Sequence, residues 1–224
     1  AIDALVNAKL ASLRIAPSPV CDDETFLRRV SLDLVGLLPT PEERARFLAD
    51  SAPDKRRRVA DELMGRKEFV ELWVMKWAEI LQIRSAGDVS PKATILYHQW
   101  LDRRIAANEP IDRMVRDLLT ATGGTFDNPP TNYFQLERNT LKLAENVAQA
   151  FLGMRIQCAQ CHNHPFDRWT MDDYYGFAAF FSQIGRKKGG DPREQIVFDA
   201  GIGNEVTLQL GGKIDMPAMG LKGK

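Results

Sequence analysis

The stretch Cys158-Ala159-Gln160-Cys161-His162-Asn163-His164 gathers two of the three cysteines and two of the three histidines of this 224-residue chain. Apolar residues at helical spacing precede it and predict a helix that ends near Gly153. After it, Thr170 and Asp173 have the spacing of a capping box, which opens another helix. The motif is therefore expected in a short connection between two helices.

Helical patterns also account for most of the chain before this connection. The expected helices cover residues 1–13, 22–35, 40 onward, 54 onward, 69–83, 90 onward, 110–124 and 140–153. Thr40 with Glu43 forms a capping box, and Asp54 repeats a capping pattern. Residues 69–83 are apolar around most of a helical circumference, which predicts a central helix buried on several sides.

The character of the chain changes near Arg186. Residues 195–198 and 206–210 are short, β-leaning and flanked by glycine, which predicts a small hairpin or an irregular tail. Residues 125–132 have the pattern of an extended loop. We therefore predict a mainly α protein: a multi-helix orthogonal bundle over residues 1–185 and a short β-leaning tail over residues 186–224, the start of a truncated following region.

The composition excludes several classes of protein. Lys and Arg balance Asp and Glu at 30 each, so no net field favours nucleic acid or an anionic membrane. No apolar run approaches the roughly 20 residues that cross a bilayer. The chain lacks an initial Met and its end completes no element, so we expect a piece of a longer or processed protein. No export signal is visible in it, and prior removal of such a signal is compatible with this expectation.

The motif C-x-x-C-H is typical of covalent c-type haem attachment. The thiols of Cys158 and Cys161 can add to the vinyl groups of haem, and the imidazole of His162 can bind the iron as proximal ligand. His164 follows too closely to reach the opposite face of the same haem. Candidates for the sixth iron ligand are His98, Met154, Met171, Met216 and Met219. A Met ligand would favour electron transfer, whereas an open position would allow ligand binding or peroxide chemistry.

Two alternatives use the same cysteines. Cys158 and Cys161 have the spacing of half a zinc site, which His164 with His98 or Asp167 could complete. The pair could also be a redox or structural C-x-x-C, although a thioredoxin-like motif belongs in a βαβ setting. The third cysteine, Cys21, is expected to be a small buried or half-buried residue. Neither the G-x-S-x-G nor the H-E-x-x-H motif of hydrolases is present.

Several separated stretches resemble one family. Residues 151–169 (FLGMRIQCAQCHNHPFDRW), 172–181 (DDYYGFAAFF), 29–40 (RVSLDLVGLLPT) and 128–130 (NPP) are similar to planctomycete-type cytochrome c domains of unknown function. The resemblance implies haem at Cys158, Cys161 and His162. It also implies a place in a long bacterial protein that is periplasmic or otherwise exported. In such proteins another cytochrome-c-like module typically precedes the domain and a further domain of unknown function follows it, so the expected partners are neighbouring redox modules of the same chain.

The functional prediction follows from the motif and the resemblance together. We expect an exported c-type haem domain that carries electrons to or from neighbouring modules of a longer chain. The alternative is a helical interaction module stabilised by zinc or a disulfide, without redox turnover. An enzymatic role of the haem is a third hypothesis, so the sequence leaves open whether the protein is an enzyme.

Overall fold

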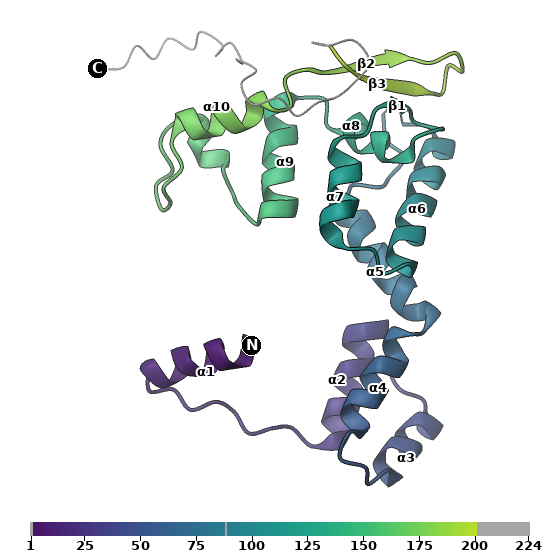
Figure 1. Cartoon of the computed structure of the whole chain (residues 1–224), viewed down its shortest axis with the longest axis vertical. Helices are drawn as coiled ribbons and strands as arrows, with labels where there is room; N and C mark the ends of the chain where they lie inside the picture. Colours follow the sequence, from purple (N-terminus) through teal and green to yellow (C-terminus); the bar gives the residue numbers. More distant parts are fainter. Residues whose placement is uncertain (1, 88, 201–224) are drawn as a thin grey trace. The chain divides into compact units, whose positions relative to one another are not determined.

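A computed structural model describes residues 2–87 and 89–200 of the chain (Figure 1). The described part is mainly α-helical and carries a small antiparallel sheet near its end, so the predicted fold class is confirmed. The chain divides after Leu72 into two compact units.

The first unit is helical. Its elements are α1 (Ile2–Ser12), α2 (Asp23–Val35), α3 (Pro41–Ala49), α4 (Lys55–Met64) and the start of α5 (Lys67–Ile80). Helix α2 packs against both α3 and α4, whereas α1 buries no residue. The predicted capping box of α3 is confirmed, because the Thr40 amide donates to Glu43 Oε2 at 2.8 Å and the Glu43 amide donates to Thr40 Oγ1 at 3.2 Å.

The start of α4 differs from the prediction. Asp54 occupies the cap position but its side chain makes no capping hydrogen bond. The ammonium of Lys55 instead turns back and donates to the carbonyls of Phe47 at 3.3 Å and Asp50 at 2.7 Å. The cation thus fixes the end of α3 rather than the start of its own helix, a contact that local spacing does not reveal.

Helix α5 forms, but it ends at Ile80 and not at residue 83 as predicted, and its predicted burial on several sides is wrong. Only Val74 is buried in it, and Met75 is 62% exposed. The chain divides into its two units inside this helix, so α5 links two cores and does not lie at the centre of one.

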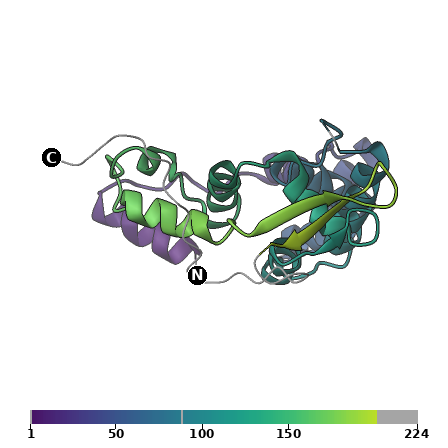
Figure 2. The same cartoon turned by 90° about the horizontal axis from the view of Figure 1, so that it is seen from above.

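The second unit holds the remaining elements. They are α6 (Pro91–Ala106), α7 (Ile111–Leu119), β1 (Gly123–Gly124), η1 (Pro129–Asn132), α8 (Tyr133–Leu136), α9 (Thr140–Leu152), η2 (Gln157–Gln160), α10 (Met171–Ala179), β2 (Ile184–Lys188) and β3 (Gln195–Asp199). The sheet order is β1-β3-β2 with both pairings antiparallel. Figure 2 shows β2 and β3 as adjacent arrows of one hairpin.

Three details of the second unit correct the sequence prediction. Gly123 and Gly124 do not end a helix; α7 stops at Leu119 and the glycines form β1, opposite Val197 and Ile196. The expected loop at residues 125–132 ends in the 3₁₀ turn η1, whose Asn132 is buried. Strand β3 pairs with the preceding β2, and the predicted strand at residues 206–210 lies outside the described residues.

Candidate functional site

Helix α9 delivers the chain to the cysteine motif. The Asn139 side chain caps its start by accepting from the amides of Leu141 and Lys142, at 3.0 and 3.1 Å. Its end is set by Gly153, whose φ of 65° lies in the left-handed region that glycine adopts without strain. The predicted helix, with both of its ends, is confirmed.

The motif forms a single tight turn on an apolar base. Ile156 and Ala159 are buried and pack with Ala148 of α9 and Tyr174 of α10. This anchoring directs the intervening residues outward, and both Cys158 and Cys161 are exposed free thiols. The Cys158 carbonyl accepts from the amides of Cys161 and His162, at 3.4 Å each, so the turn brings all three motif residues together.

The two histidines of the motif hold their protons differently. His162 is exposed, and its Nδ1 lies 2.7 Å from the Asn163 carbonyl oxygen, which can only accept. This hydrogen bond assigns the proton of the neutral ring to Nδ1 and leaves the Nε2 lone pair free. A metal-binding histidine is commonly held in this way, since its other nitrogen donates to a carbonyl or carboxylate.

His164 has the opposite arrangement. Its Nδ1 accepts from the Phe166 amide at 3.3 Å, so the proton of the neutral ring belongs on Nε2. The two rings are therefore not equivalent as ligands, although they lie two residues apart. His162 therefore presents a free Nε2 lone pair, whereas His164 presents an Nε2–H donor.

The loop after the motif is closed by its own hydrogen bonds. The His164 amide donates to the Trp169 carbonyl at 2.8 Å, and the Met171 amide donates to Asn163 Oδ1 at 3.2 Å. Phe166 stands at the tip with 94% of its surface exposed. A fully exposed aromatic side chain near the motif in sequence is free to pack on an apolar surface outside the loop.

A buried polar network between α9 and α10 supports the core on which the motif turn packs, and it was not predicted from the sequence. The Tyr174 hydroxyl donates to Glu145 Oε1 at 2.8 Å, and Lys142 pairs with Glu145 Oε2 at 2.8 Å. Burial, reinforced by the carboxylate of Glu145, raises the pKa of Tyr174. The sequence feature that could have revealed this network is Glu145, a glutamate on the apolar face of α9. Tyr175 adds a hydrogen bond from its hydroxyl to the Gln160 carbonyl at 3.3 Å.

The expected sixth ligands are distributed as follows. Met154 and Trp169 border a small hollow of about 50 Å³ beside the core of the motif, and Met171 begins α10. His98 is exposed on α6, which packs against η1, whereas the motif turn η2 packs against α10. Met216 and Met219 lie outside the described residues.

The zinc alternative requires a third and a fourth ligand. Among residues 2–87 and 89–200, no group of three Cys, His, Asp or Glu side chains is gathered in a form that could hold a metal ion. Asp167, which the sequence offered as a partner, accepts from the Trp169 indole at 3.1 Å and from the Arg168 amide at 2.7 Å. The two thiols and the free Nε2 of His162 fit the attachment of haem, which needs no further side chain for its covalent links.

Comparison with known proteins gives the family. The model of a family described as PSCyt2, protein of unknown function (DUF1549), matches residues 1–186. The chain belongs to this family. No curated protein and no solved structure matched it. The predicted domain of unknown function is thereby confirmed, and the family description assigns it no activity. Among the described residues, no helix has both the length and the apolar character needed to cross a bilayer.

Proposed function

We propose that this chain is a c-type haem domain of a longer exported protein and carries electrons between neighbouring modules. Cys158 and Cys161 would form the thioether links, and His162 would bind the iron through Nε2. The observation that carries the proposal is the pairing of two exposed thiols on one turn with an imidazole whose Nδ1 donates to the Asn163 carbonyl.

Each residue near the turn has a defined part in this proposal. Haem attached here would supply a one-electron couple. The Asn163 carbonyl would fix the ring plane of His162, as carbonyl partners of metal-bound histidines do. The Nε2–H of His164 suits a carboxylate acceptor such as a haem propionate. Tyr175 holds the turn through the Gln160 carbonyl.

If haem is attached here, the identity of the sixth iron ligand would decide between electron transfer and catalysis. Met171 follows the closed loop, and its amide is tied to Asn163, next to His162. A thioether ligand from this position would fill the sixth site, raise the reduction potential and favour an electron carrier. If the sixth site stayed open, the same domain would bind small ligands.

The test is expression of the chain in a host that has cytochrome c maturation. We expect a Soret band and the mass of one covalent haem, both lost in the Cys158→Ala, Cys161→Ala double variant. His162→Ala should remove the native reduced spectrum, whereas His164→Ala, the matched control two residues away, should retain it. Cys21→Ser is a second control, since Cys21 lies in the first unit.

Two results would contradict the proposal. A colourless protein carrying zinc or a Cys158–Cys161 disulfide, purified from a host that loads a reference cytochrome, would favour the alternative of a stabilised interaction module. A spectrum unchanged in His162→Ala but lost in His164→Ala would reverse the roles of the two histidines.

A further inference from the structure

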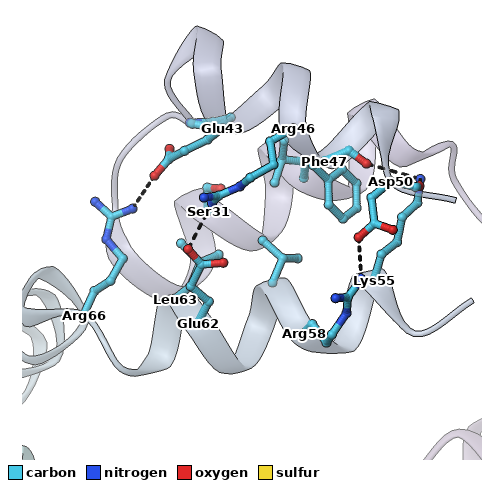
Figure 3. Close-up of a pocket in the computed structure, with 13 residues that line it drawn as sticks. Ser31, Glu43, Arg46, Phe47, Asp50, Lys55, Arg58, Glu62, Leu63 and Arg66 are labelled. Carbon is cyan, nitrogen blue, oxygen red and sulfur yellow. Dashed lines mark hydrogen bonds and ion pairs between the residues drawn. The ribbon is translucent and has the colours of Figure 1, made fainter. Parts of the chain in front are cut away.

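A second site lies in the first unit and is independent of the cysteine motif. Helices α3 and α4 both pack on α2 and leave between them a hollow of about 260 Å³, drawn in Figure 3. Its apolar lining includes the buried side chains of Leu27, Phe47 and Leu63. Small-molecule sites are mostly apolar clefts of ~300–1,000 Å³; this hollow, at about 260 Å³, lies just below that range and suits a small metabolite.

Three ion pairs span the hollow from one helix to the other. The charges on α3 and the residue that follows it run negative, positive, negative, and those on α4 and the turn after it have the opposite signs. The pairs are Glu43 with Arg66 at 2.9 Å, Arg46 with Glu62 at 3.0 Å, and Asp50 with Arg58. Figure 3 shows the Arg46–Glu62 pair between the other two.

The middle pair is held least firmly. Arg66 pairs with both Glu43 and Glu68, and its side chain is 29% exposed. At the other end, Asp50 meets Arg58 through its carboxylate and Lys55 through its carbonyl. Arg46 and Glu62 are 66% and 57% exposed and meet through a single contact, and exposed pairs of this kind contribute little to stability. A ligand can therefore part the middle pair while the end pairs keep the helices in place.

A hydroxyl on the wall of the hollow is also available. Ser31 of α2 lines the hollow and is only 2% exposed. Its hydroxyl makes no hydrogen bond within the part of the chain that the structure describes. A hydroxyl on the wall of a hollow can donate to an acceptor, or accept from a donor, that a ligand supplies.

We propose that this hollow binds a free α-amino acid with an apolar side chain of about the size of leucine. Its carboxylate would pair with Arg46 and accept from the Ser31 hydroxyl, and its ammonium would pair with Glu62. The side chain would rest on Leu27 and Leu63.

The charge pattern selects this class of ligand. A ligand that parts Arg46 from Glu62 must satisfy both charges. A simple anion would leave Glu62 facing a like charge, and a simple amine would do the same to Arg46. A neutral ligand would break the pair without replacing either contact. A zwitterion replaces both contacts. Burial of a hydrocarbon side chain against the apolar lining then adds favourably to the free energy of binding.

The test is calorimetric titration of the full chain with three probes of nearly equal shape: L-leucine, 4-methylpentanoate and 3-methylbutylamine. We expect leucine to bind and each analogue, which lacks one charged group, to bind at least about tenfold more weakly. Absence of leucine binding at millimolar concentration, or equal binding of the analogues, would overturn the proposal. These measurements need no variant.

Variants then locate the bound amino acid. Arg46→Met and Glu62→Gln should each weaken leucine binding by about tenfold or more. Arg57→Met is the matched control, because Arg57 also lies on α4 and pairs with Asp61, but its 86% exposed side chain is not part of the hollow. Equal loss in Arg57→Met, with circular dichroism showing all three variants folded, would place any binding elsewhere.

Discussion

At the scale of single residues, loss of the hydrogen bond from the Tyr174 hydroxyl should lower the free energy of unfolding most. It is buried and donates to Glu145, a carboxylate that is itself 5% exposed. Tyr174→Phe leaves that carboxylate with one donor fewer, so we expect the free energy of unfolding to fall by about 1–3 kcal/mol. Urea denaturation followed by circular dichroism measures the change.

The neighbouring tyrosine provides the control. Tyr175 donates to the Gln160 carbonyl at 3.3 Å and is only half-buried, so Tyr175→Phe should cost clearly less. A cost equal to that of Tyr174→Phe would show that the buried carboxylate is not the cause.

Tyr174 also makes the stability of the folded chain depend on pH. The pKa of Tyr174 is raised in the folded chain, chiefly by burial, so its contribution to stability is complete below the ordinary value of 10.0. The contribution is lost as the pH rises from 10.0 to the higher folded pKa, because in that range the unfolded phenol ionises while the folded one stays protonated. Stability measured between pH 8 and about 11 should therefore fall less steeply in Tyr174→Phe. An identical slope in both proteins would contradict this assignment.

At the scale of elements, two glycines on either side of the motif should respond in opposite ways to the same substitution. Gly153 ends α9 with φ of 65° and has no atom within 4 Å of an added Cβ. Gly153→Ala should therefore cost about 1 kcal/mol from backbone strain alone. Gly176 lies inside α10 in equally open space, and Gly176→Ala should stabilise by about 0.5–1 kcal/mol. Thermal unfolding gives both values, and a shared sign would show that contacts, not backbone conformation, decide them.

The elements also show which structural features could be predicted from sequence patterns and which could not. Caps that depend on residues three or four apart were predictable, as Thr40 and Thr170 show. Gly123 was not, because its strand partner Val197 lies more than 70 residues later. The motif itself could be found in the sequence, but the proton positions of His162 and His164 depend on backbone carbonyls and amides that only the folded loop brings near.

At the scale of the whole molecule, the division after Leu72 makes a clear spectroscopic prediction. All four tryptophans, Trp73, Trp77, Trp100 and Trp169, belong to the second unit. Tryptophan fluorescence therefore reports the unfolding of that unit, whereas circular dichroism reports the helices of both. Two units with separate cores are expected to unfold as separate transitions, so the two signals should not coincide.

A pair of core substitutions tests this division in the intact chain. Leu63 is 5% exposed in the first unit and Leu143 is 2% exposed in the second. Each change to alanine should cost about 2–5 kcal/mol in its own unit. Leu63→Ala should then shift the helical signal while the fluorescence midpoint stays in place, and Leu143→Ala should shift the fluorescence midpoint. If Leu63→Ala moved both signals equally, the two units would unfold as one. Haem attached at Cys158 should, for the same reason, stabilise only the transition that fluorescence reports.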